Sequence, residues 1–542
     1  MTPPVIAPWL RGYRRDWFSR DAVAGVVAAC VVVPQAIAYA GLAGLPVQVG
    51  LYAALVPMVV YALLGSSRAL SVSVTSTISI LTASAIAASA DGPSRAALLA
   101  ILVGVILLVA GLARLGFLAD LISLPILTGY KAGTGLFILS GQLGKVLGIS
   151  VGGKGFIENV GDLISGLGHI SGATLALGAA TLALLVWMRR AVPKIPGPLV
   201  AVALGIVAVQ VLDLTAHGVA VVGSVKSGLP PFGVPSFTGW RILAPAAAGI
   251  ALMSAVESLA AGRALVKADD RPVDANRELV ALGAASVGGG LFSAYPSGGG
   301  LSQSVVQSDA GARTQLASVV CAAVVALVLT ALTGVLAHLA QATLGALVIV
   351  AAVALINPAE IARIARVRRR DFVLSLIALA GVLVFGVLDG VILAVAASIG
   401  VLVYQTNRPP VDRLGIDPAT GDLRELQPGE PSGLSPGVIA VRPRGRLFFA
   451  NARRVCQNIT EIVANEDPPP RIVIVDFIAT PDLEVTAVAA IHEMSNALRQ
   501  NGVQVWGAGF SPEEGRMFRG WGPDPNARGF ATVERAIAAT TP

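Results

Sequence analysis

Apolar runs of near-spanning length recur along most of this chain, from Val23 to about Tyr404. A helix that crosses a bilayer needs roughly 20 consecutive, mostly apolar residues. Only 13% of the residues are charged and 55% are hydrophobic, whereas a soluble domain carries about 25% charged residues. We therefore expect a polytopic α-helical membrane protein.

The apolar runs resolve into about fourteen transmembrane segments, several of them short or broken. Clusters of Lys and Arg precede the first segment and otherwise follow even-numbered ones, as at Arg68, Arg114 and the run RVRRR at 366–370. Because cytoplasmic loops carry an excess of Lys and Arg, both termini are predicted to be cytoplasmic. Residues 1–20 are expected to form an N-terminal cytoplasmic segment.

The composition changes after about Asn407, where the chain becomes charged and rich in proline. Strand-like runs (GVIAVRP and RIVIVDF) then alternate with the helical pattern TAVAAIHEMSNALRQ. This alternation is typical of a small sheet flanked by helices. We expect a membrane domain at 21–406, a linker at 407–436 and a cytoplasmic α/β domain at 437–542.

The membrane domain contains a weak internal repeat. The stretches LSVSVTS (70–76) and LSQSVVQ (301–307) share Leu, Ser, Ser and Val at the same offsets, and they begin the third and the tenth segments. The two stretches begin segments that are seven segments apart. Because seven is an odd number, the second copy would enter the membrane in the opposite orientation. Inverted repeats are typical of secondary transporters, and here they would span about 21–216 and 241–406. Chance similarity in a chain rich in Ser and Val is the alternative.

The stretch YPSGGGLSQS (295–304) interrupts an otherwise apolar region. Its proline and three successive glycines predict unwound backbone, which is tolerated at membrane depth only where it is buried in protein or lines a cavity. Two short helices that begin near the middle of the membrane would direct their N-terminal N–H groups toward a shared anion site. The hydroxyls of Thr75 and Ser302 would add donors, although small residues also serve plain helix packing.

Two other segments carry polar groups at membrane depth. In the first segment, Gln35 and Tyr39 lie about one turn apart on one face, next to the helix-breaking Pro34. They are predicted either to line the site or to join helices. In the eighth segment, Glu257 has apolar turns on both sides, which marks a functional position. Removal from water favours the neutral form of a carboxyl group, so Glu257 is predicted to carry a coupling proton, with a Na⁺ site as the alternative.

Other features argue against other classes of protein. The three cysteines match no metal or disulfide spacing, and no nucleophile–base set, metal cluster or phosphate loop occurs at a useful spacing, so neither an enzyme nor a cofactor is expected. The net charge of +7 comes from basic residues beside apolar segments, which argues against nucleic acid. Lys131 and Lys145 lie near segment ends, and their side chains are predicted to reach the interface.

Taken together, these stretches resemble the SulP family of sulfate permeases. Residues 21–72 resemble its first signature, AYPSGGGLSQSVVQSDAGARTQ its tenth-segment motif, and GRLFFANARRV followed by VIVDFIATPDLEVTAVAAI its C-terminal STAS domain. The resemblance covers nearly the whole chain in the same order. It implies fourteen segments in two inverted seven-segment repeats, divided into core and gate parts. It also implies elevator-like transport of a small anion by a homodimer in the cytoplasmic (plasma) membrane.

The resemblance further implies which residues bind the anion. Carried over position by position, the substrate site comprises Gln35, Tyr39, Thr75, Ser76, Gly300, Leu301, Ser302 and Gln303. Glu257 takes the position at which family members with a glutamate are inferred to couple transport to protons. Sodium-coupled bicarbonate members have an aspartate there.

The sequence departs from the family pattern at two places. Ser73 and Val74 stand where the third-segment motif often has Gly-Pro, and Gln303 stands where an arginine commonly helps to hold the anion. Without that fixed charge, a dianion would depend on dipoles, hydroxyls or cotransported protons. Proton-coupled uptake of sulfate or a similar inorganic anion is the main prediction, with a bicarbonate or dicarboxylate transporter as the alternative. A nucleobase permease is a more distant alternative, because those permeases usually lack a STAS domain.

Overall fold

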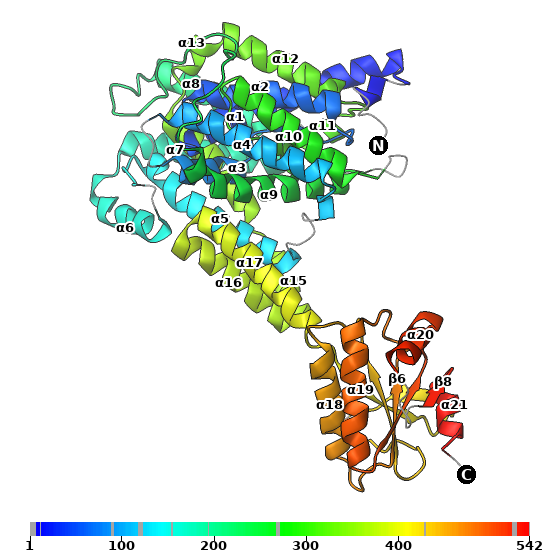
Figure 1. The fold of residues 1–542 in the computed structure, drawn as a ribbon. Helices are drawn as coiled ribbons and strands as arrows, with labels where there is room; N and C mark the ends of the chain where they lie inside the picture. Colours follow the sequence, from blue (N-terminus) through cyan, green and yellow to red (C-terminus); the bar gives the residue numbers. More distant parts are fainter. Residues whose placement is uncertain are drawn as a thin grey trace. The chain divides into compact units, whose positions relative to one another are not determined.

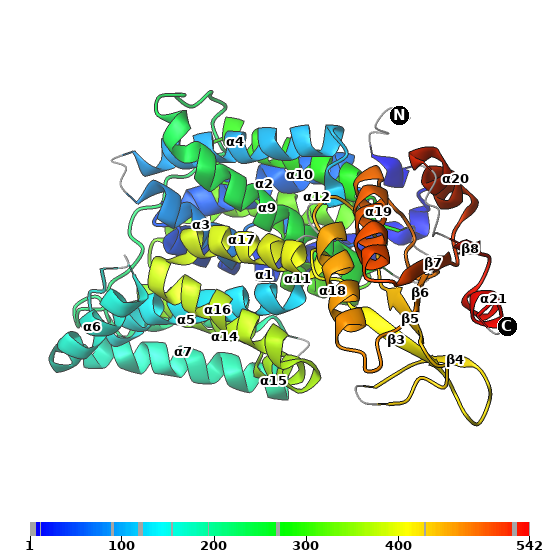
Figure 2. The ribbon, with the colours of Figure 1, turned by 60° about the horizontal axis from the view of Figure 1, so that its bottom comes forward.

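The computed structural model of the chain describes residues 7–10, 12–87, 91–117, 123–152, 155–192, 195–266, 272–427, 430–522 and 528–540. They form two compact units, Met1–Ser398 and Ile399–Pro542, which are described separately (Figures 1 and 2). The first unit contains the apolar helices, and the second contains a six-stranded sheet.

Helices make up most of the described part of the first unit. Its first half contains α1 (Phe18–Leu42), α2 (Val47–Leu64), β1 (Val72–Ser73), α3 (Ser76–Ile86), α4 (Gly92–Leu112), α5 (Leu124–Leu147), α6 (Phe156–Gly166), α7 (Gly172–Ala191) and α8 (Gly197–Val211). Its second half contains α9 (Trp240–Ala264), α10 (Ala275–Leu291), β2 (Gly298–Gly299), α11 (Leu301–Asp309), α12 (Leu316–Ala331), α13 (Thr333–Leu336), α14 (Gln341–Leu355), α15 (Pro358–Val367), α16 (Arg369–Phe385) and the part of α17 (Val387–Thr406) up to Ser398. Short 3₁₀ turns occur at Pro8–Leu10, Arg15–Trp17 and Leu167–His169.

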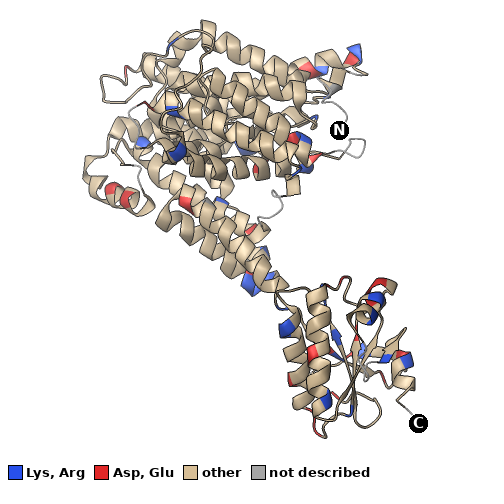
Figure 3. Ribbon diagram, in the orientation of Figure 1, with Lys and Arg blue, Asp and Glu red and all other residues tan. Residues whose placement is uncertain are grey.

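The first unit has the surface and composition of a membrane protein. Among the described residues, seven helical segments are long and apolar enough to cross a membrane, and three shorter apolar helices, α3, α8 and α12, accompany them. Large apolar side chains such as Val105, Val109 and Leu112 of α4 are exposed, which is stable only where lipid covers them. Charged residues are sparse along these helices (Figure 3).

The two halves of the first unit repeat the same packing arrangement. Helix α4 packs against α10 and α9, while its counterpart α12 packs against α2 and α1. The helices of the two halves correspond in pairs: α1 to α9, α2 to α10 and α4 to α12. With this correspondence, the contacts of α4 with α10 and α9 match those of α12 with α2 and α1. The strands β1 and β2 precede the equivalent helices α3 and α11, and they pair antiparallel. The two copies therefore run in opposite directions where they meet.

The helices of this unit divide into two groups. The core group consists of α1–α4 and α9–α12, which pack mainly on one another. The gate group consists of α5–α8 and α14–α16, and Figure 2 shows α5, α14, α16 and α7 side by side. Contacts of α1 with α14 and α8 join the two groups. This division corresponds to the core and gate parts that the family resemblance implies.

One close helix crossing in the core group depends on two glycines. A methyl group at Gly104 of α4 would lie 2.6 Å from the carbonyl oxygen of Gly283 of α10, and a methyl group at Gly283 would lie 2.7 Å from that of Gly104. Small residues allow the backbones of membrane helices to approach in this way. The pair therefore sets the spacing of α4 and α10, which lie side by side in Figure 1.

Replacing Gly104 with leucine is expected to destabilise the membrane unit by about 3 kcal/mol, because the added side chain meets backbone that cannot move away. The apparent melting temperature in detergent measures the effect. Gly161→Leu in α6 is a matched control, since nothing lies within 4 Å of a side chain added at that position. Equal melting temperatures for the two variants would contradict the prediction.

The second unit is an α/β domain. It contains β3 (Val411–Ile416), β4 (Leu423–Glu425), β5 (Val438–Pro443), α18 (Ala452–Ala464), β6 (Ile472–Asp476), α19 (Val485–Gln500), β7 (Gln504–Ala508), α20 (Pro512–Trp521), β8 (Arg528–Phe530) and α21 (Val533–Ala538). The strand order is β4-β3-β5-β6-β7-β8, with parallel pairing from β5 to β8 and antiparallel pairing of β3 with its two neighbours. Val473 and Val475 of β6 pack with α18 and α19, whereas Ile474 packs on the opposite face with α21. Helices therefore cover both faces of the sheet.

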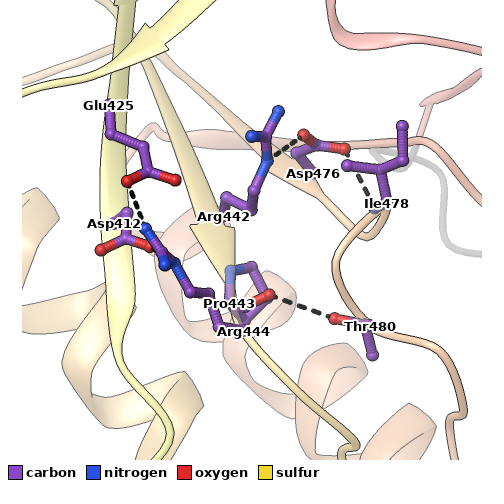
Figure 4. A network of polar contacts seen from close by, with 8 residues as sticks. All are labelled: Asp412, Glu425, Arg442, Pro443, Arg444, Asp476, Ile478 and Thr480. Carbon is purple, nitrogen blue, oxygen red and sulfur yellow. Dashed lines mark hydrogen bonds and ion pairs between the residues drawn. The ribbon is translucent and has the colours of Figure 1, made fainter.

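Ion pairs at one end of β5 join the antiparallel edge of this sheet to its parallel part (Figure 4). The Arg442 guanidinium lies 2.7 Å from the buried Asp476 carboxylate of β6. Arg444 pairs with Asp412 of β3 and Glu425 of β4. Charge-assisted contacts of this kind have defined geometry, so they fix the ends of four neighbouring strands relative to one another.

Candidate functional site

The antiparallel ribbon of β1 and β2 is the centre of the candidate site. Val72 lies opposite Gly299, and Ser73 lies opposite Gly298. Pro296 and the following glycines prevent α10 from continuing into α11, so this stretch is extended rather than helical. Each strand leads directly into a short helix, and the N–H groups of a first helical turn point back along the chain. The N-termini of both α3 and α11 are therefore directed toward the ribbon.

Side chains of α11 hold the ribbon together. The Ser71 N–H donates to the Ser304 hydroxyl (2.8 Å), and the Gln303 side-chain amide donates to the Ser71 carbonyl (3.1 Å). The Ser73 hydroxyl donates in turn to the Gln303 side-chain oxygen (3.1 Å). Gln303 is buried, and both ends of its amide are engaged in this way. Through these hydrogen bonds, Gln303 links the β1 segment to α11. Its contact with an anion stays a prediction.

Helix α9 binds the other strand of the ribbon. The Ser254 hydroxyl donates to the Ser297 carbonyl (2.9 Å), and the Gly299 N–H donates to the Ser258 hydroxyl (2.7 Å). Sequence reasoning missed both serines. Their spacing with Glu257 is the sequence signal that identifies them. The three polar residues occur within one and a half turns of an apolar helix, so they share one face.

Glu257 lies between these two serines, and the hydroxyls of α3 approach it. Its carboxylate interacts with the hydroxyls of Thr77 and Thr75, and with the charge of Lys131 of α5. Although its neighbours Val256 and Ser258 are buried, Glu257 keeps an accessible fraction of its surface. The carboxylate is therefore surrounded by protein without being sealed from solvent.

The predicted site residues of α1 lie beside α3. Tyr39 is buried, and its hydroxyl interacts with the Ser76 side chain at the start of α3. Gln35 lies one turn earlier on α1 and is half-buried. The structure thus brings together the predicted residues of α1, α3 and α9.

The start of α11 offers backbone donors. Thr75 caps α3, since its side chain accepts from the Ile78 N–H (3.2 Å), but Gly300 precedes α11 and supplies no side-chain cap. Gly300 is half-buried, and Leu301 and Ser302 are exposed. Uncapped N–H groups at a helix N-terminus, next to a serine hydroxyl, favour a bound anion.

This arrangement suits a small anion rather than a metal ion. It combines two helix N-termini, several hydroxyls and one carboxylate. Among the described residues, no group of three or more His, Cys, Asp or Glu side chains is placed to hold a metal ion. A polar ribbon at the centre of a repeated helix bundle is the arrangement found in membrane transporters.

The fold and this centre define a multi-pass membrane transport protein with a C-terminal STAS domain. Residues 18–378 match the family model described as "Sulfate permease family", and residues 434–536 match the STAS domain. The chain belongs to the sulfate permease family. The family resemblance seen in the sequence is thereby confirmed, and the protein is a transporter rather than an enzyme.

Two curated relatives are similar over nearly the whole chain. A "probable sulfate transporter" of Mycobacterium tuberculosis is 37% identical over 500 residues, which cover 91% of this chain and 89% of that protein. "Probable sulfate transporter 4.2" of Arabidopsis thaliana is 31% identical over 523 residues, which cover 92% of this chain and 77% of that protein.

Two solved structures share the fold. The murine Slc26a9 anion transporter in its inward-facing state has a TM-score of 0.88 at 22% identity, covering 98% of this chain and 93% of that chain. The transmembrane domain of the cyanobacterial bicarbonate transporter BicA has a TM-score of 0.61 at 22% identity, covering 72% of this chain and 99% of that one. These likenesses confirm the predicted fold, a polytopic helical membrane domain followed by an α/β STAS domain.

Proposed function

We propose that this protein carries a small anion across the membrane, with sulfate or a similar inorganic anion as substrate and proton-coupled uptake as the mode of transport. The observation that carries the proposal is the β1–β2 ribbon, where α3 and α11 start within the membrane unit and α11 has no side-chain cap. The positive ends of helix dipoles contribute to stabilising an anion.

The proposed substrate site is the one that the family pattern assigns. It consists of Gln35, Tyr39, Thr75, Ser76, Gly300, Leu301, Ser302 and Gln303. Ser302 and the backbone of Gly300 and Leu301 supply donors at accessible positions. Gln303 contributes by fixing the start of α11 against Ser71 and Ser73.

Glu257 is proposed as the residue that carries the coupling proton. It is the carboxylate next to the anion site, and two threonine hydroxyls of α3 interact with it. An ionisable residue in this position takes part in ion coupling in many transporters. A protonated Glu257 also removes a negative charge from the neighbourhood of the anion. Coupling to Na⁺ is the alternative.

Sulfate is favoured over bicarbonate or a dicarboxylate by the relatives. The proteins that are 37% and 31% identical over most of this chain both carry the name of sulfate transporters. The bicarbonate transporter is a structural neighbour at 22% identity, which supports only the fold. A nucleobase permease is disfavoured by the STAS domain at 434–536.

An elevator-like movement of the core group against the gate group is proposed as the transport mechanism. Hydrogen bonds of the ribbon with α9 and α11 join the site to the core group, so the site would move with that group as one body. We expect the protein to work as a homodimer in the cytoplasmic membrane, with both termini cytoplasmic because basic clusters follow the even-numbered segments.

Reconstitution tests the proposed function. Purified protein in liposomes is expected to take up radiolabelled sulfate when a proton gradient is imposed, and to take up labelled bicarbonate and dicarboxylates more slowly. Proton and Na⁺ gradients are imposed separately, and protein-free liposomes serve as the control. Absence of uptake of all three anions by folded protein would contradict anion transport, and uptake driven only by Na⁺ would contradict the proton as coupling ion.

A further inference from the structure

Lys131 of α5 is electrostatically linked to the candidate site. It lies about two turns into α5 and is half-buried. Its positive charge acts on the Glu257 carboxylate of α9. Within the described part of the chain, its ammonium group forms neither a hydrogen bond nor a direct ion pair. The two opposite charges therefore influence each other without a direct contact.

Two buried hydroxyls accompany Lys131 on α5. Tyr130 is 1% exposed and Thr134 is 1% exposed, and neither hydroxyl has a hydrogen-bond partner among the described residues. Tyr130 also interacts electrostatically with Glu257, so this part of α5 faces the site. Buried polar groups are nearly always paired. The two hydroxyls, one turn apart, act on each other without forming a hydrogen bond of good geometry, so a polar ligand beside Lys131 would give them a partner.

The charge balance of the site also calls for a cation. Helix α11 contains no Lys or Arg, and the Gln303 amide is engaged by Ser71 and Ser73. Each helix N-terminus supplies about half a positive charge, which Glu257 opposes whenever it is ionised. A dianion such as sulfate carries two negative charges, so two helix ends alone do not neutralise it.

We propose that Lys131 is an anion-binding residue that the gate group contributes to the site on the core group. It supplies the fixed positive charge that α11 lacks, and the anion lies between its ammonium group and the N-termini of α3 and α11. The inference rests on the proposed function, because it assigns a further ligand to the same site. Since α5 belongs to the gate group, the anion is held between the two groups of helices.

Neutral and charge-conserving variants test this role. Lys131→Gln is expected to raise the half-saturating sulfate concentration by about tenfold or more, as loss of a charged hydrogen bond does. Lys131→Arg should stay within a few-fold of the original protein, because the charge is kept. Lys145→Gln is the matched control on the same helix: its amine lies beside Gly41 of α1 rather than near Glu257. It should leave sulfate uptake unchanged.

The outcomes separate this inference from the proposed function. If the unmodified protein transports no anion, the proposed function fails. If it transports sulfate and Lys131→Gln has unchanged sulfate affinity, the role of Lys131 is overturned. Should Lys131→Gln fail to fold, the unmodified protein is labelled with acetic anhydride, and acetylation of Lys131 is read by mass spectrometry. Sulfate is expected to slow that acetylation relative to Lys145, and equal rates with and without sulfate overturn the proposal.

Discussion

Glu257→Gln is expected to abolish proton-driven accumulation of the anion while anion binding remains measurable. Glutamine keeps the size of the side chain and imitates the neutral, protonated carboxyl group, but it cannot release a proton. The contacts with Thr75 and Thr77 remain possible, so the start of α3 keeps its position. Anion exchange, which requires no net proton movement, should therefore continue, whereas uptake against a concentration gradient should stop.

Proteoliposomes measure both activities. Accumulation of sulfate is followed under an inward proton gradient, and exchange of internal for external sulfate is followed at equal pH. Glu158→Gln is the control, because this exposed carboxylate of α6 lies outside the core group. If the Glu257 variant still accumulates sulfate under a proton gradient, the coupling role of this residue is wrong.

Glu278→Ala is expected to lower the melting temperature of the membrane unit by about 10 °C or more. This carboxylate of α10 is 1% exposed. It accepts hydrogen bonds from the Tyr61 hydroxyl (2.7 Å), from the Ser66 hydroxyl, and from the N–H groups of Ser66 and Ser67 (2.9 Å each). Removing one partner of such a buried charged network costs about 3–5 kcal/mol, because the other groups lose their partner without gaining water.

The effect should extend to the site, because the loop at Ser66 and Ser67 leads into β1. Thermal unfolding in detergent measures stability, and sulfate uptake by the surviving folded fraction measures function. Asp309→Ala, at the exposed end of α11, is the control for loss of a carboxylate in the same group. A melting temperature equal to that of the control would show that the Glu278 network contributes little to stability.

The ribbon shows how far sequence reasoning reached. Pro296 and the glycines that follow predict a break before the tenth segment, and the structure has extended backbone there. The repeated pattern at 70–76 and 301–307 predicts the partner of this segment. In the structure Val72 and Ser73 pair with Gly299 and Gly298, just before the second stretch, and Ser304 and Gln303 of that stretch bond to Ser71. The register, in which Ser73 lies opposite Gly298, follows only from packing against α9 and α11. No local pattern specifies it, because glycine and serine have weak preferences of their own.

Lys131 and Gln303 show what local sequence patterns leave open. The sequence predicts that Lys131 reaches the membrane interface, although hydropathy fixes the ends of a segment poorly. In the structure, Gly129 and Gly133 place α5 against α16, and Tyr130 and Lys131 of the same helix interact electrostatically with Glu257. Gln303 stands where the family pattern commonly has an arginine, and its amide is engaged by Ser71 and Ser73. The surroundings of both residues depend on which face of a helix packs against its neighbour.

By itself, the sequence determined the class of protein, the order of its domains and the positions where helices break. These properties depend on local composition: apolar length, proline, glycine and the placement of charge. Only the tertiary structure decided which polar groups meet in the site and which are engaged in holding it together. In a helix bundle whose segments are apolar nearly all round, hydropathy does not define the facing side. Close helix crossings, such as that of Gly104 with Gly283, set it instead.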